Sequence, residues 1–343
     1  MKRFVALALT VVLAFALVGC GSANTGEPAQ KDNQAESNSG GTEPVKVAVV
    51  MSGPISDGSW NAAAYQGLME AKGKYGIEPA YIENVAQADA EGAFRDYADQ
   101  GYDLIIGHGA QFTDPVKKVA PNYPDVKFVV LNSDIAQEPN VGSIRFRATE
   151  IAFVTGAVAG LMTKTGKVGI IGGLEIPVIT EAVHGFLAGA KYANPNVETT
   201  YAYVGDWNDV AKAKELAITM MDSGVDVIQN NANQAGLGII EAAKARPGVM
   251  VIGNVTDQNK LAPDTVLTSG LQKIPVLVDF AVSQVVNGKW EAKNYKLGLK
   301  EGAVDLAPWH GFESKVPQDV KDRIQEIKEN IINGKLSDVV PQS

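Results

Sequence analysis

Cysteine is almost absent from this chain, since Cys20 is the only one among 343 residues. With no second cysteine the chain forms no internal disulfide. Histidine is nearly as scarce, and His108, His184 and His310 do not have the His-x-x-x-His spacing of a metal site. We therefore expect neither a disulfide-stabilised fold nor a metal centre.

Positive charge is also in short supply. The chain has 30 Lys and Arg against 39 Asp and Glu, a net charge of −9, which becomes −11 once Lys2 and Arg3 are removed with an N-terminal signal. Because no basic stripe is present to neutralise phosphates, nucleic acid is not an expected partner.

Enzyme and cofactor motifs are missing as well. The glycines of 169–173 lack both the Gly-x-Gly-x-x-Gly spacing and the Lys-Ser/Thr of a phosphate loop. His108 follows an apolar run and can contact a ligand, but no nucleophile lies near it in the sequence. We expect a protein that is not an enzyme and that has no cofactor.

The N-terminus has the pattern of a secretory signal. Lys2 and Arg3 precede an apolar run at 4–18 that is short for a membrane span. The run ends in Leu17-Val18-Gly19-Cys20, which resembles the bacterial lipobox. We expect residues 1–19 to be a signal peptide and Cys20 to be lipidated, although a buried or reactive thiol is the alternative. The protein would then be anchored to the cell membrane on its extracytoplasmic side.

Residues 20–44 follow the signal and contain almost nothing apolar after Cys20. A segment of Gly, Ser, Asn, Gln, Glu and Lys cannot bury enough surface to offset its ordering entropy, so we expect a disordered tether.

Residues 45–343 are too many for one ordinary domain and suit two. Short Val- and Ile-rich runs alternate with longer helical patterns, and their continuous apolarity is typical of strands buried on both faces of a parallel sheet. We predict an α/β fold of two lobes, each with a parallel sheet covered by helices, joined by a three-segment hinge. The predicted strands are 47–51, 104–107, 128–131, 168–171, 225–228, 249–252 and 266–269.

The predicted boundaries place 45–147 and 256–288 in the first lobe, and 148–255 and 289–343 in the second. The hinge would lie near 147, 253–258 and 286–290. Helices are expected at 149–162, whose Ala and Gly content suggests close packing, and at 210–222, 274–286 and 317–333. Asp114 before Pro115, and Asn208 or Asp209 before Val210, have the pattern of helix N-caps.

Ligands of open parallel sheets bind at the carboxyl ends of the strands, so the loops that follow the predicted strands should line the site. These loops carry aromatic and amide side chains, which suit a flat heterocycle stacked on rings and hydrogen-bonded along its edge. Trp60 and Trp207 could instead pack in the lobe cores, and Asp57 could act only as a helix cap. The candidate ligand-binding residues are Asp57, Trp60, Asn61, Phe112, Glu175, Trp207, Asn208, Asn231, Asn254, Asp257 and Gln272.

Several motifs resemble the basic membrane protein family, the substrate-binding lipoproteins of ABC transporters related to purine nucleoside receptors. The resemblance runs from about Lys46 to the C-terminus, and no single motif carries it alone. The similar segments are Asp57-Gly58-Ser59-Trp60-Asn61, Phe112-Thr113-Asp114-Pro115, residues 164–169, Gly205-Asp206-Trp207-Asn208-Asp209 and residues 236–243. Trp60 and Trp207 stand where the family usually has phenylalanine.

The resemblance implies a type I periplasmic-binding fold with two Rossmann-like lobes, and a purine held between rings of the two lobes. We expect a monomer that delivers this ligand to permease subunits. Nucleoside-binding members hold the ribose with an acidic residue two before an Asp-Gln pair and with a Lys after a Thr-Ser. In this chain those positions are Val255, before Asp257-Gln258, and Gln272. We therefore favour a free purine base such as adenine, or a related heterocycle. A purine nucleoside, or a ligand-sensing role for a membrane receptor, is the alternative.

Overall fold

Each predicted apolar run overlaps a strand of the structure, and further strands lie at 78–82, 141–146, 198–203, 294–297 and 304–306. The computed structural model describes residues 43–57 and 60–342, and their strands form two six-stranded sheets. The predicted signal peptide, the lipidation of Cys20 and all but the last two residues of the predicted tether lie outside the described residues.

The first sheet is parallel throughout and has the order β11-β5-β4-β3-β1-β2. Successive residues of β1 point to opposite faces, so Val49 packs in one apolar core and Val50 in another. The strands are β1 (Lys46–Met51), β2 (Glu78–Ile82), β3 (Leu104–His108), β4 (Lys127–Leu131), β5 (Val141–Phe146) and β11 (Asn294–Leu297).

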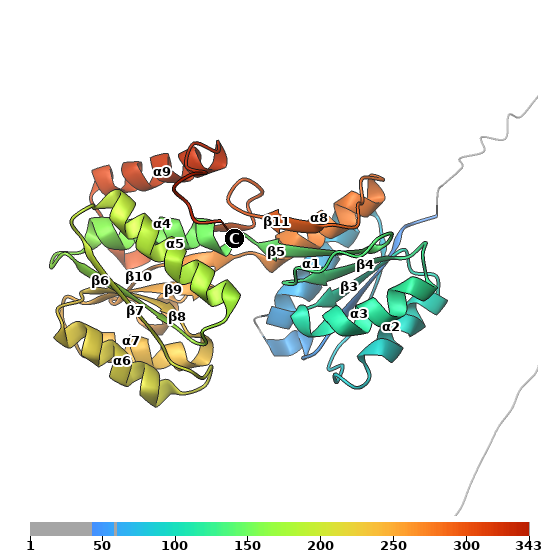
Figure 1. Ribbon diagram of the computed structural model, residues 1–343, viewed down its shortest axis with the longest axis horizontal. Helices are drawn as coiled ribbons and strands as arrows, with labels where there is room; N and C mark the ends of the chain where they lie inside the picture. Colours follow the sequence, from blue (N-terminus) through green and yellow to red (C-terminus); the bar gives the residue numbers. More distant parts are fainter. Residues whose placement is uncertain (1–42, 58–59, 343) are drawn as a thin grey trace, which may run out of the picture. The chain divides into compact units, whose positions relative to one another are not determined.

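Helices cover both faces of this sheet (Figure 1). Residues of α1 (Trp60–Tyr75) and α8 (Ile274–Val286) belong to one core, and residues of α2 (Ala90–Asp99) and α3 (Thr113–Val119) to the other. The predicted helix at 274–286 is confirmed. The predicted cap at Asp114 is wrong, because α3 already begins at Thr113 and Asp114 lies in its first turn.

The second sheet has the order β12-β10-β9-β8-β6-β7, and only β12 runs antiparallel to its neighbour. On one face lie α4 (Ala148–Met162), α5 (Pro177–Ala193) and α9 (Gln318–Ile332), and on the other α6 (Val210–Asp222) and α7 (Gly236–Lys244). The strands are β6 (Lys167–Gly172), β7 (Glu198–Tyr203), β8 (Val227–Asn231), β9 (Met250–Val255), β10 (Val266–Gln272) and β12 (Val304–Leu306). The predicted cap of α6 is confirmed, since Asp209 Oδ1 accepts the Lys212 backbone N–H at 2.9 Å.

The chain crosses between the two sheets three times, at Arg147, at Lys273 and at 298–303. The crossing at Arg147 matches the hinge predicted near 147. The other two predicted hinge segments are wrong, because 253–258 lies between β9 and β10 of the second sheet and 286–290 lies between α8 and β11 of the first lobe. Two of the predicted lobe boundaries also need correction. Strand β10 belongs to the second sheet, although 256–288 was assigned to the first lobe, because it pairs with β9. Strand β11 belongs to the first sheet, although 289–343 was assigned to the second lobe, because it pairs with β5. An apolar run predicts a strand but not the sheet that it joins.

Helices α4 and α5 approach very closely, as the small residues of α4 predict. A Cβ added at Gly189 would lie 1.9 Å from the carbonyl oxygen of Phe153, and one at Gly156 would lie 2.0 Å from that of Phe186. Since these neighbours are backbone atoms, neither contact can be relieved by turning a side chain.

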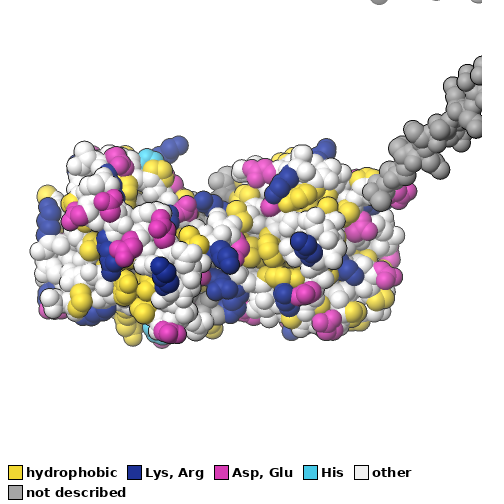
Figure 2. Space-filling model, turned by 90° about the horizontal axis from the view of Figure 1, so that it is seen from above, with side chains coloured by type: hydrophobic (Ala, Val, Ile, Leu, Met, Phe, Trp, Pro, Cys, Tyr) yellow, Lys and Arg dark blue, Asp and Glu magenta, His cyan; other side chains and the backbone are white. Residues whose placement is uncertain are grey.

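The surface of the described residues carries mixed charge. Acidic and basic side chains are interspersed over the face seen in Figure 2. Within the described ranges, no helix combines the length and apolarity needed to cross a membrane.

We expect Gly189→Ala to lower the free energy of unfolding by about 1–3 kcal/mol, because the added methyl forces α4 and α5 apart. Urea denaturation of the purified protein measures this change. The control is Gly73→Ala in α1, where an added Cβ meets nothing within 4 Å. It should stabilise the helix by up to about 1 kcal/mol. A Gly189→Ala protein as stable as the parent would contradict the close packing.

Candidate functional site

A cavity of about 350 Å³ lies where the carboxyl ends of both sheets' strands meet. This volume is within the range of about 300–1,000 Å³ typical of small-molecule sites. Its walls are formed by residues at or after the carboxyl ends of seven strands, β1, β4, β6, β7, β8, β9 and β10. The lining residues are Trp60, Asn132, Val178, Ile179, Trp207, Asn230, Asn231, Asn233, Asn254, Val255, Thr256, Gln258 and Gln272.

Amide groups supply nearly all of the polar lining, and none of the lining residues is charged. Two pairs of amides are hydrogen-bonded to each other. Asn254 Nδ2 donates to Asn231 Oδ1 at 2.5 Å, and Asn230 Nδ2 donates to Gln258 Oε1 at 3.1 Å. An amide keeps both donors and acceptors available after one such bond, so this wall can bind a ligand edge that carries both.

Trp60 is the first residue of α1, and the cap of that helix holds it in place. Carboxylate oxygens of Asp57 accept the backbone N–H groups of Asn61 and Ala62 at 2.9 and 3.0 Å. Asn61 Nδ2 donates to the same carboxylate at 2.9 Å, and Asn61 is buried. Asp57 and Asn61 therefore position Trp60 and do not themselves line the cavity.

His108 supports one face of the Trp60 ring. The two ring centres are 4.3 Å apart and the rings are inclined by 23°. His108 Nε2 lies 2.9 Å from the Trp60 carbonyl oxygen, to which it donates. Burial lowers the pKa of His108 to about 4, so the imidazole is neutral at neutral pH. The neutral imidazole stacks on one face of the indole, and Trp60 also lines the cavity.

Trp207 reaches the same cavity from the second lobe. Its indole lies over Gly173, where an added Cβ would be 2.3 Å from two of the ring carbons. The Ala235 backbone N–H donates to the Trp207 carbonyl oxygen at 2.8 Å. Only glycine at position 173 leaves room for this ring position.

The structure brings five of the predicted site residues to the cavity: Trp60, Trp207, Asn231, Asn254 and Gln272. Glu175 and Asn208 are exposed and do not line it. Asp257 instead pairs with His310, whose Nε2 lies 2.6 Å from Asp257 Oδ2.

Phe112 was predicted to bind the ligand, and this prediction is wrong. Its side chain is fully buried in the core under α2 and α3, with its ring 5.6 Å from that of Phe94. An aromatic residue after a strand looks the same in the sequence whether it turns toward a ligand or back into the core.

Eight residues that line the cavity were not among the candidate site residues. They are Asn132, Val178, Ile179, Asn230, Asn233, Val255, Thr256 and Gln258. Asn132 follows a predicted strand, which was an available signal. The family resemblance places Val255 at a ribose-binding position, and its φ of 69° is uncommon for a β-branched residue.

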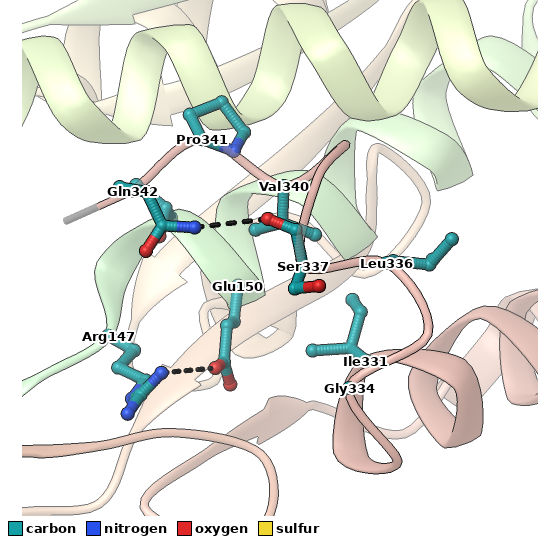
Figure 3. Close-up of a pocket in the computed structure, with 10 residues that line it drawn as sticks. Arg147, Glu150, Ile331, Gly334, Leu336, Ser337, Val340, Pro341 and Gln342 are labelled. Carbon is teal, nitrogen blue, oxygen red and sulfur yellow. Dashed lines mark hydrogen bonds and ion pairs between the residues drawn. The ribbon is translucent and has the colours of Figure 1, made fainter.

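A smaller cavity of about 150 Å³ lies beside the crossing at Arg147 (Figure 3). Arg147 and Glu150 form an ion pair there, 3.6 Å apart, opposite the C-terminal segment around Val340. None of the predicted site residues lines it. In the part of the chain that the structure describes, no group of three or more His, Cys, Asp or Glu side chains could hold a metal ion.

Comparisons with known proteins identify the family and the fold of the chain. The family model of PnrA-like ABC transporter substrate-binding proteins, called Bmp, matches residues 44–339. Basic membrane protein A2 of Borrelia garinii is 32% identical over 86% of this chain and 88% of its own length. A purine-binding protein of Brucella abortus is 33% identical over 86% of this chain and 83% of its own length.

A solved ABC transporter solute-binding protein of Aeropyrum pernix has the same fold. It has a TM-score of 0.68 and 28% identity, over 88% of this chain and 94% of its own. The sheets, the shared cavity and the family match over nearly the whole described chain lead to one conclusion. The chain belongs to the PnrA-like (Bmp) family of ABC transporter substrate-binding proteins.

Proposed function

We propose that the chain captures a neutral planar heterocycle of the purine type, with a free base favoured, and delivers it to the permease of an ABC importer. The observation that carries this proposal is a cavity lined by two indoles and several amides but by no charged side chain. A charged ligand would enter such a site without a counter-ion, which costs free energy, whereas a neutral ring can satisfy the amides.

Stacking would supply much of the affinity. Base stacking on an aromatic ring contributes about 1–3 kcal/mol in nucleic-acid-binding proteins, and Trp60 and Trp207 offer one ring from each lobe. The similarity to the purine-binding protein of Brucella abortus supports the same ligand class. Lobe rotation about the three crossings would close the two rings over the ligand.

The base is favoured over the nucleoside because of Val255 and Gln272. Both line the cavity, at the positions where the family resemblance places the charged groups that hold ribose. A valine cannot accept a hydrogen bond from a sugar hydroxyl, and a glutamine brings no charge. Purine nucleosides are the alternative ligands, and a sensing role at a membrane receptor is the alternative to transport.

The location proposed for the protein follows from its N-terminal sequence. Signal peptide removal at residues 1–19 and acylation of Cys20 would anchor a monomer outside the cytoplasm. Mass spectrometry of the protein from membranes would show the acyl mass on Cys20.

We expect Trp60→Ala and Trp207→Ala each to weaken binding of the best purine ligand by at least about tenfold, which is the loss of one stacking contact. Isothermal titration gives the affinity, and thermal unfolding checks the fold. Trp60→Phe and Trp207→Phe are the matched controls, because each keeps a ring in place and should retain most of the affinity. Unchanged affinity in both alanine variants would mean that the ligand binds elsewhere.

A second titration series compares adenine, guanine and hypoxanthine with their nucleosides. We expect each base to bind more tightly than its nucleoside. The double variant Val255→Asp with Gln272→Lys should shift the preference toward nucleosides, and aspartate tolerates the positive φ of position 255 better than valine does. Tighter binding of every nucleoside by the parent protein would overturn the choice of a free base.

A further inference from the structure

Arg145 is a buried cation beside the cavity that the proposed function leaves unused. It lies on β5, two residues before the chain crosses to the second sheet at Arg147. Only 10% of its side chain is exposed. A guanidinium held this far from water needs partners, and the identity of those partners indicates what it does.

The partners of Arg145 come from both lobes. Its Nε lies 2.9 Å from Asp134 Oδ1, in the loop that follows β4 of the first sheet. Asn294 Nδ2, on β11 of the same sheet, donates to that oxygen at 2.6 Å. Arg145 Nη1 donates to Glu181 Oε2 at 3.4 Å, and Glu181 lies on α5, which packs against the second sheet. Arg145 is thus fixed in one lobe and reaches a carboxylate of the other.

This contact lies at the edge of the ligand cavity. Arg145 and Asp134 line a pocket of about 240 Å³ together with Phe146 and Ala148 at the crossing. Asn132, Val178 and Gln272 line both this pocket and the ligand cavity. A change in the angle between the lobes would therefore alter the distance between Arg145 and Glu181.

We propose that Arg145 is a positioning residue, whose ion pair with Glu181 holds the two lobes near the closed arrangement and so raises the affinity for every ligand alike. The distance of 3.4 Å exceeds the roughly 2.7–2.9 Å of a strong charge-assisted hydrogen bond, so the pair can shorten as the lobes approach. Closure also removes water around it, which strengthens the attraction. Asp134 keeps the guanidinium neutralised and oriented in either state.

A contact that acts on the lobe equilibrium has a recognisable signature. Ligand affinity scales with the fraction of protein in the binding-competent arrangement, so weakening the pair lowers the affinity for all ligands by one common factor. A residue that touched the ligand would instead change the order of preference among ligands. The two roles can therefore be separated by experiment.

The test is Glu181→Gln, which removes the charge but keeps the shape of the side chain and leaves Arg145 paired with Asp134. We expect affinities for adenine, hypoxanthine and adenosine to fall by the same factor, about two- to tenfold. In small-angle X-ray scattering, the ligand-free variant should have a larger radius of gyration than the ligand-free parent. At saturating ligand the two proteins should scatter alike.

Glu198→Gln is the matched control, because it removes the same charge from an ion pair within the second sheet. Glu198 Oε2 lies 3.1 Å from Lys167 Nζ, and both residues belong to neighbouring strands. This variant should leave affinity and scattering unchanged.

Three outcomes would overturn the proposal: Glu181→Gln binds as tightly as the parent or more tightly, its ligand-free scattering is unchanged, or its affinity falls for one ligand only. The inference rests on the proposed function for its ligands. Scattering of the ligand-free proteins tests the lobe contact without any ligand. If the protein bound no purine, the proposed function would be overturned, but the lobe contact would still have been tested.

Discussion

The direction of the strands is the constraint on which the site depends. Among the described residues, every neighbouring pair of strands is parallel except β10 with β12, so the loops after the strands gather at one edge of each sheet. The two edges share one cavity, with Trp60 contributed by the first lobe and Trp207 by the second. Neither lobe alone could enclose a flat ring from both sides. The three crossings let two lobes line one cavity.

The cavity is lined by uncharged side chains, and the charged or titratable side chains near it have other roles. Asp57 is used to cap α1, Asp257 is paired with His310, and His108 is kept neutral by burial behind Trp60. What remains in the cavity is amide, indole and aliphatic surface. Such a lining can recognise shape and hydrogen-bonding pattern, which is consistent with the substrate-binding role of the family.

The two-lobed α/β fold and the place of Trp60 and Trp207 at the cavity could be predicted from the sequence, because both depend on local signals. Buried parallel strands are continuous apolar runs, and Trp60, the first residue of α1, lies in the segment that follows β1. Prediction from the sequence failed where distant pairing decides the outcome: β10 and β11 joined the opposite sheets from those predicted, and Phe112 turned into the core. Val255 has a positive φ, which a single sequence does not reveal, whereas Asn132 directly follows a predicted strand and could have been included.

Because the cavity has no charged lining residue, the closure of the two lobes would have to be controlled by groups outside it. If ligand and lining both lack charge, the ligand itself cannot draw the lobes together over a distance, and contact forces act only once the rings are close. A charged pair at the edge of the cavity, such as Arg145 with Glu181, can supply that attraction without entering the binding site. Recognition would then depend on the amides and indoles, while the resting angle of the lobes would depend on the ion pair. Substitutions in one set should therefore alter ligand preference, and substitutions in the other should alter affinity uniformly.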